Sequence, residues 1–112
     1  MATRRTLGEL EHLLLLAILR LGEGAYGVTM RREIEERTGR PVSLGSIYPT
    51  LDRLEEKAYV SSFMSEPTKA RGGRSRRYFR LEKAGREALE RAHAVFVAMW
   101  EGLEPRSGVG GR

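Results

Sequence analysis

The chain has 112 residues, enough for one packed domain and too few for a second core of useful size. Hydrophobic residues make up 40% of it, which excludes wholesale disorder, and the lack of cysteine excludes disulfides, thiolate metal sites and thiol redox chemistry. The net charge of +5 is concentrated, because residues 66–80 hold six basic side chains and one acidic one while the rest of the chain sums to zero. Such a cationic segment predicts contact with a polyanion.

The first apolar stretch runs from Leu13 to Leu19 and superficially resembles a secretory signal. Glu9 and Glu11 interrupt its approach, however, and Arg20 closes it. The stretch is also far shorter than the ~18 residues that a membrane-spanning helix needs. We therefore expect a buried helix in a cytoplasmic protein.

Helical periodicity predicts a first helix over residues 7–21 and a second over residues 26–38. Gly39 provides a left-handed stop for the second helix, and Pro41 prevents its continuation. The first helix is apolar nearly all round, which predicts burial on more than one side. In a domain of this size we expect another subunit to cover part of it, at Leu15 and Leu19.

The third predicted helix, over residues 44–57, has two clearly different faces. Either Ser43 or Ser46 can cap its start. With Ser46 as the cap, Pro49 is easily placed; with Ser43 as the cap, Pro49 is interior and should distort the first turns. An inward stripe at helical spacing comprises Leu44, Ile47, Leu51, Leu54 and Ala58. The opposite face gathers Gly45, Ser46, Pro49, Asp52, Arg53, Glu56 and Lys57, with Tyr48 on its flank.

Two strand-like segments, residues 59–64 and 76–81, follow the third helix, and Gly72-Gly73 between them marks a turn. Together they predict a β-hairpin whose tip and return strand carry the cationic segment. The alternative is an ordinary solvated charge run. Five basic residues between positions 69 and 77, with no acid among them, argue against it.

The last predicted helix covers residues 83–103 and carries an apolar seam with alternating spacings of three and four. Its length of ~30 Å is too great for so small a core to cover, which predicts a partner surface and hence a homodimer. We expect one folded unit over residues 1–82, a dimerisation helix over 83–103 and a flexible tail over 104–112. The seam consists of Ala88, Leu89, Ala92, Val95, Phe96, Met99 and Leu103.

Catalytic and metal-binding patterns are absent from the sequence. His12 and His93 lie far apart, and neither forms a recognisable ligand pattern with nearby carboxylates. No nucleophile–base pair or phosphate-cradling glycine loop is present either. We expect neither an enzyme nor a bound metal or cofactor.

Three helices followed by a hairpin with a basic tip is the order of a winged helix-turn-helix, a mainly α fold with a small β-hairpin. In that fold a helix enters the major groove and reads base edges, while cationic loops contact phosphates. Gly45 and Ser46 would let the backbone approach closely, Arg53 offers a bidentate guanidinium and Tyr48 a hydroxyl. Their alternatives are a packing aromatic for Tyr48 and a side-chain pair on a solvated face for Arg53. Because Asp52 and Glu56 are unfavourable near phosphates, we expect the N-terminal half of this helix to enter the groove.

These residues resemble the PadR family of transcriptional regulators over about residues 9–90. The most specific element is the segment from Ser43 to Glu55, SLGSIYPTLDRLE, which is similar to the family's signature third helix. Residues 13–19, Tyr26-Gly27 and residues 35–39 agree with its first two helices. The wing is matched by residues 72–74 and 76–81, and the start of the last helix by residues 84–86. The chain departs from the family in having Tyr26-Gly27-Val28 where His-Gly-Tyr is frequent, and Glu82 where a threonine cap is common.

The resemblance implies a homodimer, joined through the last helix with help from the first, that binds a roughly palindromic operator and acts as a repressor. It also implies a compact branch of the family without a separate C-terminal domain. A small aromatic effector at the dimer centre is a further expectation, with Phe96 and Trp100 lining its pocket; the alternative is that both only fill the helix seam. A winged-helix module that recognises a protein instead of DNA is the competing function. The candidate DNA contacts are Tyr26, Ser43, Gly45, Ser46, Tyr48, Pro49, Arg53, Lys69, Arg71, Arg74 and Arg76.

Overall fold

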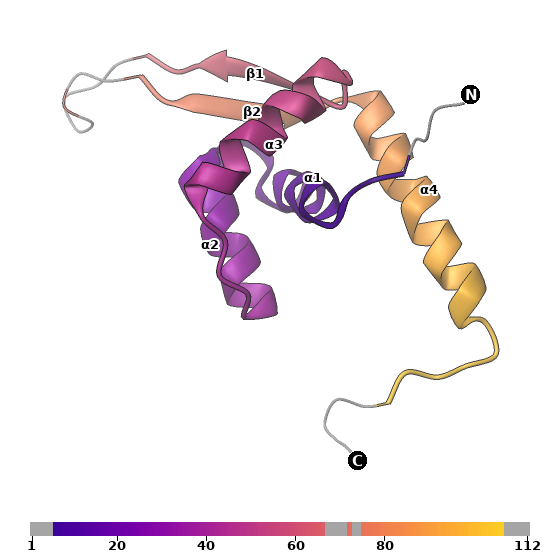
Figure 1. Ribbon diagram of the computed structural model, residues 1–112. Coiled ribbons are helices and arrows are strands. Elements are labelled where there is room, and N and C mark those ends of the chain that lie inside the picture. The colour runs from indigo at the N-terminus through magenta and orange to yellow at the C-terminus, as the bar shows by residue number, and fades with distance from the viewer. Residues whose placement is uncertain (1–5, 67–71, 73–74, 107–112) are drawn as a thin grey trace.

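The computed structural model describes residues 6–66, 72 and 75–106, and its elements follow the predicted order (Figure 1). The predicted positions of Lys69, Arg71 and Arg74 fall outside the described residues. The fold is mainly helical with one two-stranded antiparallel hairpin, as the sequence predicts. Its elements are α1 (Glu9–Leu21), the short 3-10 helix η1 (Gly22–Gly24), α2 (Gly27–Thr38), α3 (Leu44–Glu56), β1 (Val60–Met64), β2 (Arg77–Leu81) and α4 (Lys83–Trp100).

The core lies where α1, α2 and α3 meet the base of the hairpin. Packing the apolar side chains of these elements together removes their surface from water, and this is the main favourable contribution to folding. Leu15 belongs to this core and is 0% exposed. The expectation that it contacts another subunit is therefore wrong, because no part of its side chain remains for a partner to touch. The largest fully buried side chains are Leu14, Leu15, Ile18, Met30, Ile47, Leu51, Leu54, Val60 and Phe79.

An ion pair between a buried carboxylate and an exposed lysine ties α1 to the end of α3. Glu11 accepts hydrogen bonds from the backbone N–H of Gly8 at 2.9 Å and from the Lys57 Nζ at 2.9 Å. Its side chain is only 10% exposed, so these two partners replace the water that a carboxylate would otherwise bind. The contact with Gly8 also closes the N-terminus of α1, where backbone donors would be left unpaired.

The start of α3 settles the question of its cap. Ser43 is the N-cap, since its Oγ accepts the backbone N–H of Ser46 at 3.1 Å. Pro49 therefore lies inside the helix, where it provides no N–H for the Gly45 carbonyl. The helix nevertheless runs unbroken, and Thr50 donates its hydroxyl to the Ser46 carbonyl at 2.9 Å.

The end of α3 differs from the predicted inward stripe. Ala58 lies beyond the helix, is exposed and has a φ of +64°. Its N–H donates to the Glu55 carbonyl at 2.9 Å, and the N–H of Tyr59 donates to the Leu54 carbonyl at 3.0 Å. This is the Schellman pattern, in which a left-handed residue reverses the chain. Ala58 thus turns the chain into β1 instead of packing in the core.

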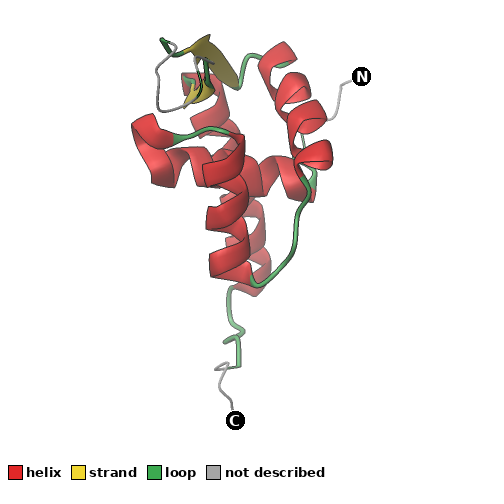
Figure 2. Ribbon diagram, turned by 90° about the vertical axis from the view of Figure 1, so that its left-hand side faces the viewer, coloured by secondary structure: helices red, strands yellow, loops and turns green. Residues whose placement is uncertain are grey.

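The hairpin pairs Val60 with Leu81 at its base and Met64 with Arg77 at its outer end. It joins the helices at its inner edge, because the Phe79 N–H donates to the Ala25 carbonyl at 2.9 Å. A further isolated bridge joins Tyr26 to Tyr78. In the turned view of Figure 2, the two strands lie together at one end of the helices.

Helix α4 begins at the base of the hairpin and extends away from the other helices (Figure 1). It ends at Trp100, three residues before the predicted end, because the backbone turns at Glu101 and Gly102 has a φ of +85°. Leu103 is therefore not part of the helical seam, and Leu89 is buried in the core at 5% exposure. In the part of the chain that the structure describes, no helix has the length and apolarity needed to cross a membrane.

Candidate nucleic-acid interface

The N-terminal half of α3 presents a small, uncharged surface. Ser43, Gly45, Ser46 and Pro49 are all exposed. The hydroxyls of the two serines lie within hydrogen-bond distance of each other, at 3.1 Å. A Cβ on Gly45 would meet only the Ser43 Oγ, at 3.8 Å, so this stretch of backbone is open to a large ligand. The first turn also lies at the positive end of the helix dipole, which favours an anion.

Tyr48 is half-buried on the flank of α3 and packs against the start of α2. A Cβ on Gly27 would lie 2.2 Å from the Tyr48 Oη, so the ring occupies the space that any other residue at position 27 would need. The structure thus supports the packing alternative for this ring. The glycine of the Tyr26-Gly27 pair is what allows α3 to lie so close to α2.

Arg53 lies on the opposite flank of α3. It is exposed, and its guanidinium donates to the Thr50 hydroxyl at 3.1 Å. Its charge also acts on Glu11. Burial alone would raise the pKa of Glu11, but the Lys57 and Gly8 hydrogen bonds and the charges of Lys57 and Arg53 outweigh it, so this pKa lies below its ordinary value. Arg53 therefore interacts with Glu11 and Lys57, near the N-terminus of α1, and also lies on the exposed face of α3.

A chain of aromatic contacts links α2 to the hairpin. Tyr26, the N-cap of α2, meets Tyr78 edge to face with ring centroids 5.3 Å apart. Tyr78 in turn stacks on Phe63 at 5.7 Å. The Arg76 guanidinium lies 4.2 Å from the Tyr26 ring centroid, and that of Arg80 lies 4.7 Å from the Phe63 centroid. Arginines on aromatic faces keep their charge accessible while their planes are held in place.

Arg76 is the one predicted wing contact that the structure describes. Its Nη1 donates to the Tyr78 hydroxyl at 3.5 Å, a hydrogen bond that raises the pKa of the guanidinium. It remains cationic at any physiological pH. Because Tyr26 adjoins Gly27, on which Tyr48 packs, the cation reaches the flank of α3 through a continuous row of contacts.

Arg77 has a role that the sequence reasoning did not identify. Its Nη2 donates to the Glu55 Oε1 at 2.7 Å and to the Asp52 Oδ1 at 3.3 Å, so it binds α3. The sequence contains a signal for this inward contact. Side chains alternate along a strand, so Arg77 lies on the same face as the buried Phe79, whereas Arg76 and Tyr78 lie on the other face. The cationic segment therefore does not act as a single surface.

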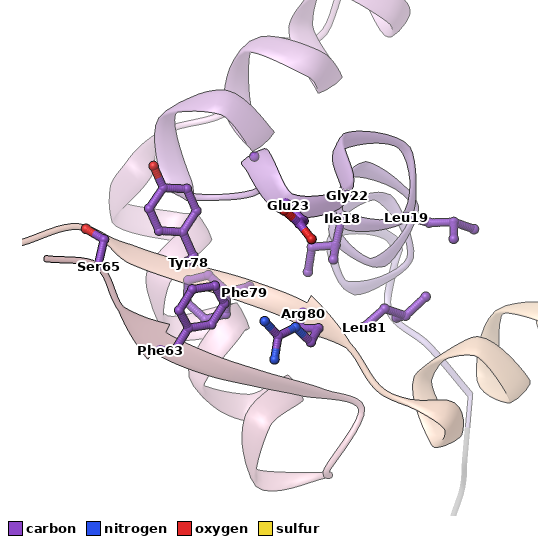
Figure 3. Close-up of a pocket in the computed structure, with 11 residues that line it drawn as sticks. Ile18, Leu19, Gly22, Glu23, Phe63, Ser65, Tyr78, Phe79, Arg80 and Leu81 are labelled. Atoms are coloured by element: carbon purple, nitrogen blue, oxygen red, sulfur yellow. The ribbon is translucent and has the colours of Figure 1, made fainter.

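A cavity of about 540 Å³ lies between the end of α1 and the hairpin (Figure 3). Figure 3 shows Phe63, Tyr78 and Arg80 on the strands, with Ile18 and Leu19 on the helix across from them. Phe96 and Trp100 do not line it; both are exposed on α4, at 60% and 49%. Among the described residues, no group of three or more His, Cys, Asp or Glu side chains is placed to hold a metal ion.

Comparisons with known proteins fit this architecture. A search of curated proteins found no match. Among solved structures, a PadR-like transcription factor from Bacteroides fragilis aligns with a TM-score of 0.70 at 28% identity, over 84% of this chain and 85% of that one. PadR family regulators from Clostridium difficile R20291 and Eggerthella lenta DSM 2243 align with TM-scores of 0.65 and 0.66 at 26% and 25% identity. The first alignment covers 86% of this chain and 91% of that one, and the second 81% and 77%.

The winged-helix fold expected from the order of elements is thereby confirmed. The family model described as the transcriptional regulator PadR-like family matches residues 15–91, which is most of the chain. This is a family of regulators and not of enzymes, in agreement with the absence of a catalytic pattern in the sequence. The chain belongs to the PadR-like family of transcriptional regulators.

Proposed function

We propose that this chain binds double-stranded DNA sequence-specifically as a homodimer and represses transcription from a pseudo-palindromic operator. The N-terminal half of α3 enters the major groove, and the hairpin contacts the adjacent backbone. The observation that carries the proposal is the row of contacts from Tyr48 through Gly27 and Tyr26 to Arg76. It holds an uncharged helix start and a fixed cation side by side, as simultaneous contact with bases and phosphates requires.

Within this interface the residues have different roles. Ser43, Gly45, Ser46 and Pro49 face the bases, and Arg53 reaches a guanine or a phosphate from the flank. Tyr48 sets the position of the helix by packing on Gly27, and Tyr26 offers its hydroxyl to a phosphate. Arg76 contacts the backbone together with the three predicted cations outside the described residues, Lys69, Arg71 and Arg74.

The experiment is to select bound fragments from random duplexes and then to titrate the selected operator and an unrelated duplex at several salt concentrations. Each neutralised phosphate should contribute about −0.9 to the slope of log K against log salt. We expect a steep slope together with a clear preference for the operator. A flat salt response without any preference, combined with recovery of a nuclease-insensitive protein partner from cell extracts, would instead favour a protein-interaction module.

Two substitutions separate the contacts. Arg76→Gln should weaken binding to every duplex by a similar factor and reduce the salt slope by about 1. Ser46→Ala should instead change the base preference at one position of each half-site and leave the slope unaltered. Equal losses from both substitutions on every duplex would contradict the assignment of α3 as the reading helix.

The second copy covers the exposed face of α4. Val95 and Phe96 are each 60% exposed and Met99 is 74% exposed, a combination that an isolated small domain rarely tolerates. Ala92, which is half-buried, lies at the start of this stripe. Leu19 on α1 is 41% exposed and lines a groove that α1 shares with the first half of α4. Dimerisation through this face would bring two α3 helices to successive turns of one operator.

An aromatic effector is the last part of the proposal. In a dimer, Phe96 and Trp100 from two subunits would enclose an apolar space with aromatic walls. Repeating the operator titration with planar aromatic compounds tests this, since a ligand that binds there should lower operator affinity and quench Trp100 fluorescence.

A regulator of chromosomal genes acts in the cytoplasm, which is the compartment we propose for it.

A further inference from the structure

Arg77 belongs to the cationic segment by sequence, but its surroundings differ from those of its neighbours. Both of its terminal nitrogens donate to the Asp52 Oδ1 at 3.3 Å, and its Nη2 also donates to the Glu55 Oε1 at 2.7 Å. The guanidinium lies 4.8 Å from the ring centroid of the buried Phe79. Its side chain is 33% exposed, so it is held against the protein on several sides.

The two carboxylates occupy neighbouring positions on α3. Asp52 and Glu55 are three residues apart, which places like charges side by side on one helix face. Arg77 compensates both charges at once, which a planar guanidinium with five donors can do and an ammonium cannot do with the same geometry.

The other strand of the hairpin, β1, also contacts the carboxylate of Glu55. The Ser62 hydroxyl on β1 donates to the Glu55 Oε2 at 2.9 Å. Glu55 therefore receives one hydrogen bond from each strand, one on each of its oxygens. The hydrogen bonds of Ser62 and Arg77 thus fix both strands of the hairpin to the C-terminal half of α3. Together they determine the angle between the hairpin and α3.

We propose that Arg77 is a positioning residue that sets the angle of the hairpin against α3 through Asp52 and Glu55, and that it does not itself contact phosphate. The inference rests on the proposed DNA-binding function. It divides the basic residues of the hairpin into those that meet DNA, such as Arg76, and one that fixes where they are held. Sequence selectivity depends on this angle, because base contacts from α3 and phosphate contacts from the hairpin must form together.

The decisive variant is Arg77→Lys, which keeps the charge but cannot bridge the two carboxylates in the same way. A positioning role predicts that the ratio of operator affinity to unrelated-duplex affinity falls by about tenfold while the salt slope stays that of the wild-type chain. A direct phosphate contact predicts nearly unchanged selectivity, since lysine also binds phosphate. Retention of the wild-type ratio by Arg77→Lys would overturn the inference.

Glu55→Gln approaches the same contact from α3. If Arg77 positions the hairpin, this variant also loses selectivity, and the double variant Arg77→Met/Glu55→Gln is no worse than Arg77→Met alone. If Arg77 contacts phosphate, Glu55→Gln tightens binding to every duplex alike because it removes a competing negative charge. That result would also overturn the inference.

Arg80→Met is the matched control, because it removes one positive charge from the same strand without touching α3. It should weaken binding to the operator and to an unrelated duplex by the same factor, so that the wild-type ratio of the two affinities is kept. A loss of selectivity as large as that of Arg77→Met would overturn the inference. Circular dichroism selects the variants that are folded at the assay temperature; if Arg77→Met is not, Arg77→Lys and Glu55→Gln still decide. A wild-type chain that binds no duplex overturns the proposed function, whereas a selective wild type with a selective Arg77→Lys overturns only this inference.

Discussion

Ala58 adopts a backbone conformation that suits glycine better than alanine. At a φ of +64° its Cβ crowds the following carbonyl oxygen, and this costs about 1–2 kcal/mol. Glycine would remove that strain but would add about 0.5–1 kcal/mol of backbone entropy to the unfolded chain. We predict that Ala58→Gly raises the free energy of unfolding by about 0.5–1 kcal/mol, measured by urea denaturation.

The control for this prediction is Ala94→Gly. Ala94 is exposed in the middle of α4, where glycine should cost about 1 kcal/mol. Destabilisation by both substitutions would mean that position 58 is not strained.

Glu11 makes the stability of the fold depend on pH. Its pKa lies below the ordinary 4.5, because the Lys57 and Gly8 hydrogen bonds and the charges of Lys57 and Arg53 outweigh burial, which acts in the opposite direction. A carboxyl with a lowered pKa stabilises the folded state above its unfolded pKa, and this contribution is lost as the pH falls through the folded pKa. We predict that Glu11→Gln lowers the free energy of unfolding at pH 7 by about 2 kcal/mol, and that the difference from the wild-type chain shrinks steadily below pH about 4.5.

Urea denaturation of both chains across this pH range checks the prediction. Lys57→Met should show a similar loss at pH 7, since it removes the same ion pair from the other side. A pH-independent difference between Glu11→Gln and the wild-type chain would contradict the ionic role of Glu11.

Among the secondary-structure elements, α4 is attached to the hairpin through Gly85. A Cβ at this position would lie 2.3 Å from the Tyr59 carbonyl oxygen and 2.9 Å from the Leu81 Cδ1. Because one of these neighbours is backbone, the start of the helix would have to move. We predict that Gly85→Ala lowers the free energy of unfolding by about 1–3 kcal/mol, despite the better helix propensity of alanine.

Gly24→Ala serves as the control for Gly85→Ala, because a Cβ on Gly24 meets nothing within 4 Å and its φ is not positive. Thermal unfolding of the two variants should show a clear fall in Tm only for position 85. An unchanged Tm for Gly85→Ala would mean that α4 can shift at little cost.

The sequence predicts the elements well and their detailed contacts less well. Among the described residues, periodicity places the four α-helices and the hairpin, because burial of one face imposes a spacing that the residues retain. Helix α1 shows the limit of such reasoning, since apolar residues surround it and spacing cannot tell that Leu15 faces its own core while Leu19 remains exposed. That distinction depends on which side the other helices pack.

The candidate site shows the same division. The exposed start of α3 could be predicted, because glycine and serine opposite an apolar stripe define a polar face. The packing of Tyr48 on Gly27 could not, because those two residues are 21 positions apart and meet only in the folded chain. Charge counted along the segment places Arg77 with its basic neighbours, and only the alternation of side chains along β2 separates it from them.

For the whole molecule, the predicted second copy can be tested directly. We expect the chain to sediment as a dimer at micromolar concentration and Phe96→Asp to sediment as a monomer, because the substitution places a charge in the middle of the apolar face. Operator affinity should fall when dimerisation is lost, since a monomer occupies only one half-site. Analytical ultracentrifugation measures the first effect and operator titration the second.

The matched variant is Ala94→Asp, which adds the same charge to the opposite side of α4 and should leave the dimer intact. A wild-type chain that is monomeric under these conditions would contradict the prediction, as would a dimer that survives Phe96→Asp.

The rigid attachment of α4 to the hairpin through Gly85 has a mechanical consequence. With 18 residues, the helix is about 27 Å long, so a tilt of about 10° at one end displaces the other by about 5 Å. One base-pair step rises about 3.4 Å. A rotation small enough to leave every contact within a subunit intact would therefore shift the two α3 helices by more than one base-pair step relative to their half-sites. The stiffness of α4 would then determine which spacing between half-sites the dimer can bind.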